Sequence, residues 1–240
     1  MTGRISLLLA FLFISSAIAS NVGEVAYGDY YKMRSRSALK TYREGLKSAI
    51  RLADRKKEVV YLNNIATIFN AAGAPDSCKR YLDEARAAAA GNKALELITG
   101  INTALFNHQL MDVSEDQIKG FKDVLTVFEL SALYTAAGRL TLPGNPDKAL
   151  GMFDRAKDAL CKETKSVGYA NALYYTACAC VQKGDMTGAV KSSEQAATVF
   201  RKGEYVLGVK KCLKLQLEIF QKTGNKSDED EARRQLARMP

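Results

Sequence analysis

Side chains that could hold a metal ion or act as nucleophiles are few in this chain of 240 residues. The single histidine, His108, has no second histidine with which to share a metal ion and no paired nucleophile in a recognisable setting. Cys178 and Cys180 are two residues apart, so on a helix they point to nearly opposite sides and cannot hold one ion. We therefore expect a surface or turn histidine and two ordinary helical cysteines.

Two longer stretches combine residue types that occur in ligand-binding loops, but their spacing does not fit. Residues 138–148, GRLTLPGNPDK, contain glycines and a lysine, yet lack the spacing of a phosphate-binding loop and a strand before it. The consecutive acids 228–231 would point in different directions at a helix start and lack the alternating ligands and the glycine of a calcium loop. The sequence thus predicts no catalytic residue, no metal site, no cofactor and no small-molecule substrate, and we expect that the protein is not an enzyme.

The elements that carry these residues follow a repeated pattern, which is clearest between Leu62 and Ala85. Apolar residues spaced by three and four form a helical stripe on each side of a break at Gly73 and Pro75. Glycine tolerates the left-handed conformation that ends many helices, and proline suits the first position of the next helix. The stretch therefore predicts a helical hairpin.

Three later stretches repeat this spacing. In the second copy, six extra residues between Leu140 and Pro146 are expected to lengthen only the turn. In the last copy the second helix is polar, as the terminal unit of a stack should be. The copies run from Val127 to Ala156, from Leu173 to Ala196 and from Leu213 to Leu236, with Gly138, Gly184 and Gly224 in the place of Gly73.

The pattern resembles the tetratricopeptide repeat (TPR), a family of helical hairpins about 34 residues long. The family's Trp is absent and its final Pro is not evident, and residues 91–122 match poorly although their apolar spacing is still helical. The resemblance implies an all-α fold, a right-handed α-solenoid of about four to five TPR-like hairpins preceded by a long N-terminal helix. Related solenoids with longer helices and an irregular helical bundle are the alternatives.

In such stacks the first helix of each hairpin lines a concave groove. The resemblance therefore implies a protein or peptide partner held by amide, phenol and ammonium groups on these helices. The flanking lysines with which some members hold acidic chaperone tails are missing, so we do not expect chaperone-tail binding. The expected partner-binding residues are Asn63, Asn64, Thr67, Asn70, Asn171, Tyr174, Tyr175, Gln182, Lys211 and Lys214.

A basic helix is expected ahead of the first hairpin, in a chain of net charge +9. Between Tyr30 and Lys57 ten bases face only two acids, Glu44 and Asp54. An acidic protein segment or lipid headgroups would complement such a surface, a solvated face is the alternative, and nucleic acid is not expected outside the cytoplasm or an organelle matrix. The basic stripe consists of Arg36, Lys40, Arg43, Lys47 and Arg51, at steps of four, three, four and four.

The apolar face of this helix, predicted over residues 37–53, should cover the open end of the stack. It is expected to carry Leu39, Tyr42, Leu46, Ile50 and Ala53. The preceding Tyr27, Tyr30 and Tyr31 belong either to a partner helix or to a mobile leader.

The first residues resemble a secretory signal: an arginine, an apolar run from Ile5 to Phe13, and small residues up to Ala19. An uncleaved anchor and a mitochondrial presequence are the alternatives. We expect a signal peptide at 1–19, a leader and basic amphipathic helix at 20–58, and a TPR-like repeat domain at 59–240. Five cysteines leave at least one thiol unpaired within the chain, and Asn225 begins a glycosylation acceptor tripeptide.

Together these features predict a non-enzymatic scaffold or adaptor for protein–protein interaction, exported through the secretory pathway. It would bind a protein or peptide through its groove or its basic helix. The alternative is a structural subunit of a larger complex, which would be mitochondrial if the leader is a presequence.

Overall fold

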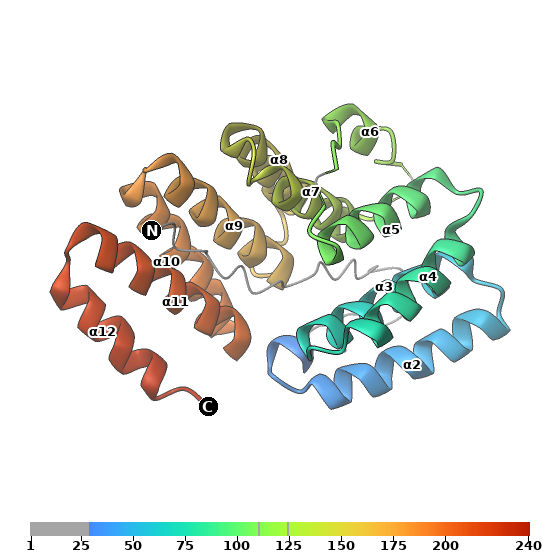
Figure 1. Cartoon of the computed structure of the whole chain (residues 1–240), viewed down its shortest axis with the longest axis horizontal. Helices are drawn as coiled ribbons and strands as arrows, with labels where there is room; N and C mark the ends of the chain where they lie inside the picture. The colour runs from blue at the N-terminus through green and yellow to red at the C-terminus, as the bar shows by residue number, and fades with distance from the viewer. Residues whose placement is uncertain (1–28, 110, 124) are drawn as a thin grey trace.

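The computed structural model describes residues 29–109, 111–123 and 125–240, and within them it is all-α, without a strand (Figure 1). The predicted signal peptide and Tyr27 lie outside the described residues. The helices are α2 (Ser35–Arg51), α3 (Arg55–Ala71), α4 (Pro75–Ala89), α5 (Lys93–Phe106), α6 (Glu115–Lys119), α7 (Val127–Thr141), α8 (Pro146–Ala159), α9 (Val167–Lys183), α10 (Met186–Lys202), α11 (Val206–Thr223) and α12 (Lys226–Ala237). The predicted all-α class is confirmed.

Neighbouring helices in the chain pack on one another, and the pairs α3–α4, α7–α8, α9–α10 and α11–α12 are all in contact. In addition, α3, α5, α7, α9 and α11 contact each other in that order, so alternate helices form a continuous row. Figure 1 shows the helices following one another along a curve from α2 to α12. No helix of the described residues is long and apolar enough to cross a membrane.

Three of the four predicted hairpin glycines end or follow a helix. Gly73, Gly184 and Gly224 have φ of +69°, +80° and +71°, the left-handed conformation that glycine adopts without strain. The prediction for Gly138 was wrong, because α7 continues through it to Thr141. Glycine is needed there for close packing, since a Cβ would lie 2.4 Å from Cε1 of Phe153 on α8.

Three of the five residues predicted for the apolar face of α2 face the core: Tyr42 is buried, and Leu39 and Leu46 are partly buried against it. Ala38, Tyr42 and Ala49 are buried, whereas Ile50 is 57% exposed. Gly45 shares the buried side: a Cβ at this position would lie 2.9 Å from the ring of Tyr61 on α3. The predicted Ile50 is exposed at the end of α2, and Ala53 is exposed beyond that end, so the prediction for these two residues was wrong.

Residues 91–122, which match the repeat poorly, still form helices. Asn92 caps α5, its side chain accepting hydrogen bonds from the backbone N–H groups of Ala94 and Leu95. After α5 only the five-residue α6 follows, where the other hairpins have a long second helix. The chain then enters α7 through a capping box of Thr126 and Glu129.

Candidate functional site

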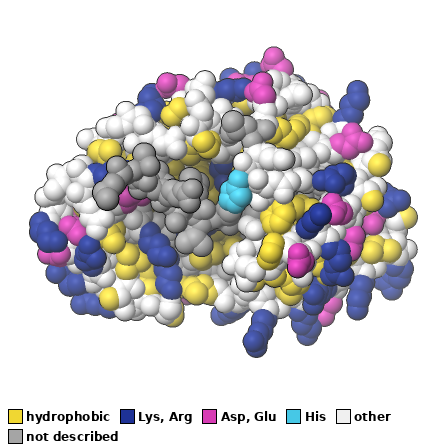
Figure 2. All heavy atoms as spheres, in the orientation of Figure 1, with side chains coloured by type: hydrophobic (Ala, Val, Ile, Leu, Met, Phe, Trp, Pro, Cys, Tyr) yellow, Lys and Arg dark blue, Asp and Glu magenta, His cyan; other side chains and the backbone are white. Residues whose placement is uncertain are grey.

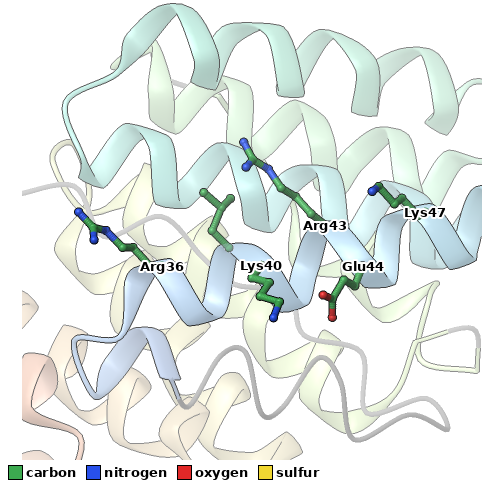
Figure 3. Close-up of a pocket in the computed structure, with 6 residues that line it drawn as sticks. Arg36, Lys40, Arg43, Glu44 and Lys47 are labelled. Atoms are coloured by element: carbon green, nitrogen blue, oxygen red, sulfur yellow. The ribbon is translucent and has the colours of Figure 1, made fainter.

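The basic stripe predicted from the sequence lies on the solvent-facing side of α2. All five of its residues are exposed. Figure 3 shows Arg36, Arg43 and Lys47 pointing to one side of the helix axis, and Lys40 with Glu44 pointing to the other. Together with Leu39 these residues line a shallow surface pocket. In Figure 2, Lys and Arg side chains project from the lower edge of the molecule, where Figure 1 places α2.

The bases of this stripe differ from the other bases near them in ion pairing. The remaining five bases between positions 30 and 57 each have a carboxylate within 4.0 Å, whereas no stripe residue has one among the described residues. Asp54, one of the two nearby acids, is already used: it caps α3 and pairs with Lys57 at 3.0 Å. The paired bases are Lys32, Arg34, Arg55, Lys56 and Lys57.

One member of the stripe is also held by aromatic contacts. The guanidinium carbon of Arg43 lies 5.7 Å from the ring centroid of Phe69 on α3. Phe69 stacks on Tyr81 of α4 with centroids 5.5 Å apart, and Arg80 lies 4.6 Å from the centroid of Tyr81. The cation–π contact of Arg43 thus joins α2 to α3, and the stacking of Phe69 on Tyr81 joins α3 to α4.

The predicted partner-binding residues of α3 are mostly inside the protein. Asn63, Asn64 and Thr67 have no exposed surface. Asn63 donates to Oγ1 of Thr99 at 3.1 Å and accepts from Nδ2 of Asn102 at 2.8 Å, so it links α3 to α5. Thr67 donates to the backbone carbonyl of Asn63, whereas the buried side chain of Asn64 has no hydrogen-bond partner among the described residues. Of this group, only Asn70 is partly exposed.

On α9 the chain's own N-terminal segment meets the predicted residues. Oδ1 of Asn171 accepts a hydrogen bond from the hydroxyl of Tyr31 at 2.9 Å. Tyr31 also stacks on Phe200 of α10, with ring centroids 5.9 Å apart. Tyr175 is buried and Tyr174 is half-buried, with ring centroids 5.0 Å apart. Thus Tyr31 belongs to the packed structure, and this part of the predicted groove contacts the chain itself.

The remaining predicted residues differ in exposure. Gln182 and Lys214 are exposed, and Lys211 is partly exposed although its Nζ is buried. Burial, together with the positive charge of Arg139, lowers the pKa of Lys211 to about 7. Sequence reasoning did not identify Arg139, a buried base on α7 whose guanidinium carbon lies 4.9 Å from the ring centroid of Tyr175 on α9.

Most thiols that could act as nucleophiles are buried or partly buried, whereas Cys161 is exposed. All five cysteines are free thiols, and burial raises the pKa of Cys78, Cys178 and Cys212 to about 12, which suppresses their nucleophilic thiolate form. His108 is exposed in the turn after α5, as predicted. The described residues contain no group of three or more His, Cys, Asp or Glu side chains that could hold a metal ion.

No protein-family description matches this sequence, and no curated protein aligns with it significantly. The likeness to the tetratricopeptide repeat therefore rests on the spacing of residues. The fold and the surface together define an all-α protein of successively packed helices, with a basic helix, α2, at one end.

Proposed function

We propose that this protein is a non-enzymatic interaction module that binds an acidic protein segment through the basic stripe of α2. Its helices would form a right-handed α-solenoid of TPR-like hairpins, with α2 covering the first of them. The chain would reach its partner in the secretory pathway, if residues 1–19 act as the signal that their composition suggests.

The observation that carries the proposal is the difference in ion pairing within one stretch of chain. Five bases near α2 have carboxylate partners, and the five of the stripe have none among the described residues. Like charges three and four residues apart on a helix repel by a few tenths of a kcal/mol per pair. An acidic partner would remove this repulsion and add ion pairs.

Apolar groups beside the stripe support a protein partner. Ile50 is 57% exposed and Leu52 is 68% exposed, and both flank Arg51 at the end of α2. Protein interfaces combine an apolar centre with a polar rim. A segment carrying several carboxylates and an apolar residue would therefore fit this end of α2.

The same exposed residues also suit the second candidate, a structural subunit whose α2 is permanently covered in a larger complex. Permanent interfaces are larger and more apolar than transient ones, and high salt does not dissociate the complexes that they hold together. The two candidate functions therefore predict different results at high salt: an adaptor releases its partner, and a subunit keeps it.

The experiment is recovery of the tagged chain from the cells that express it, at about 0.15 M and about 1 M salt. Three forms are compared: wild type, Lys40→Glu/Lys47→Glu, and the control Lys191→Glu/Lys202→Glu. The control changes net charge equally at two exposed lysines of α10 that have no ion pair with described residues.

An adaptor should release its partner at high salt, lose it in the α2 variant and keep it in the α10 variant. A subunit should keep its partners at both salt concentrations. Recovery of the same proteins with all three forms at low salt would contradict binding through the stripe.

A further inference from the structure

Two cationic groups are buried in the row of alternate helices without an anionic partner among the described residues. Arg139 of α7 is 7% exposed, and its Nε and Nη1 are buried without a hydrogen-bond partner. Nζ of Lys211 on α11 is likewise buried and without one. Burial lowers the pKa of Lys211 most, and the positive charge of Arg139 lowers it further, so the two cations lie within electrostatic reach of each other.

An aromatic ring lies against each of these cations. The guanidinium carbon of Arg139 lies 4.9 Å from the ring centroid of Tyr175, and Nζ of Lys211 lies 5.5 Å from that of Tyr31. Tyr30 contacts Tyr31 edge to face, with centroids 5.6 Å apart. Such rings attract a cation by roughly 0.5–2 kcal/mol each, but they accept few hydrogen bonds and carry no charge.

The energy of this arrangement favours an anion. A buried charge without a partner costs several kcal/mol, and two like charges close together add to that cost. The N–H groups on Nε, Nη1 and Nζ are donors, and charge-assisted hydrogen bonds to an oxyanion are about twice as strong as neutral ones. From this geometry we infer that Arg139 and Lys211 form an internal binding site for a small oxyanion, a ligand that carries a carboxylate or phosphate group.

The size of the ligand follows from the residues around the two cations. Tyr30 and Tyr31, of the segment before α2, are 6% and 2% exposed. A peptide in extended conformation would have to displace Tyr31 from Asn171 and Phe200, whereas a small oxyanion needs only the N–H groups of the two bases. The site is therefore distinct from the stripe on α2 and does not depend on the function proposed for it.

The test is calorimetric titration of the full chain with inorganic phosphate and, separately, with citrate, at constant ionic strength set by sodium chloride. Wild type should bind at least one of the two, and the tighter one identifies the ligand class. Arg139→Gln and Lys211→Met should each weaken binding at least about tenfold, because each removes charge-assisted hydrogen bonds.

Two controls separate this site from general attraction of anions. Lys214→Met removes an exposed charge from the same helix and should change the affinity less than about twofold. Lys40→Glu/Lys47→Glu should bind the anion as wild type does. Equal weakening by Lys214→Met and Lys211→Met would overturn the inference, as would heats no different from those of sodium chloride alone.

Thermal unfolding keeps the test decisive if a variant folds poorly. The anion should raise the unfolding midpoint of wild type and of Lys214→Met, but not that of Lys211→Met. An unchanged midpoint of wild type in phosphate and in citrate, relative to sodium chloride, would contradict the site.

Discussion

The hydroxyl of Tyr31 donates a hydrogen bond to Oδ1 of Asn171 at 2.9 Å, although the two residues are 140 positions apart. With the stacking of Tyr31 on Phe200, this bond fixes the segment before α2 to α9 and α10. The first described residues therefore contact the later half of the chain, and residues predicted to bind a foreign peptide help to hold the protein's own segment.

Removal of this contact should destabilise the protein in two distinguishable steps. Tyr31→Phe loses the hydrogen bond but keeps the stacked ring, and should lower the free energy of unfolding by about 1 kcal/mol. Tyr31→Ala also loses the buried ring and should cost about 3–5 kcal/mol. Urea denaturation followed by circular dichroism measures both. A Tyr31→Ala variant as stable as wild type would show that the segment is not packed as described.

The two glycines in α7 and α8 offer a matched pair for testing the packing of that hairpin. Gly138→Ala should destabilise by about 1–3 kcal/mol, because the new Cβ overlaps the ring of Phe153. Gly151 is exposed within α8 with nothing within 4 Å of a Cβ, so Gly151→Ala should stabilise by about 0.5–1 kcal/mol. If both changes stabilised the protein, Gly138 would be an ordinary helix position and the close contact with α8 would be refuted.

Lys211 should make stability increase with pH near neutrality. Its pKa is about 7 in the folded protein and about 10.4 when unfolded, so between these values the unfolded chain binds more protons and the free energy of unfolding rises with pH. The surrounding titratable and charged groups are Arg139, Cys178 and Cys212, and the ring of Tyr31 lies against the ammonium. Burial raises the thiol pKa values to about 12, which opposes the trend only above about pH 8.5.

The check is urea denaturation between about pH 6.5 and 8, a window that avoids thiol ionisation. Wild type should gain roughly 1 kcal/mol over this range, and Lys211→Met should lose most of that gain. An identical pH profile for the two proteins would mean that the Lys211 ammonium is not buried.

The hairpins were predictable from sequence because they depend on local signals. Gly73, Gly184 and Gly224 follow helical apolar stripes, and the chain folds there as the pattern predicts. Gly138 has the same spacing, but it lies within α7, at a place where a Cβ would overlap the ring of Phe153 on α8. Local spacing cannot distinguish a glycine that ends a helix from one that lets two helices approach.

The candidate sites divide in the same way. The stripe of α2 was predictable, because exposed charges on one helix follow its period alone. The surroundings of Arg139 were not, because Tyr175 and Lys211 reach it from two other helices. Spacing also misplaced Asn63, whose amide is used between α3 and α5, because amides that join helices and amides that face a partner have the same periodicity.

The most direct test of the central claim is the affinity of the purified protein for a fluorescent oligo-glutamate peptide, measured by anisotropy at about 0.15 M salt. Binding by wild type should weaken about tenfold or more in Lys40→Glu/Lys47→Glu, because two cations of the stripe become acids that repel the peptide. It should weaken less than about threefold in Lys191→Glu/Lys202→Glu, which has the same net charge. Equal weakening in the two variants, or no binding by wild type, would contradict the account.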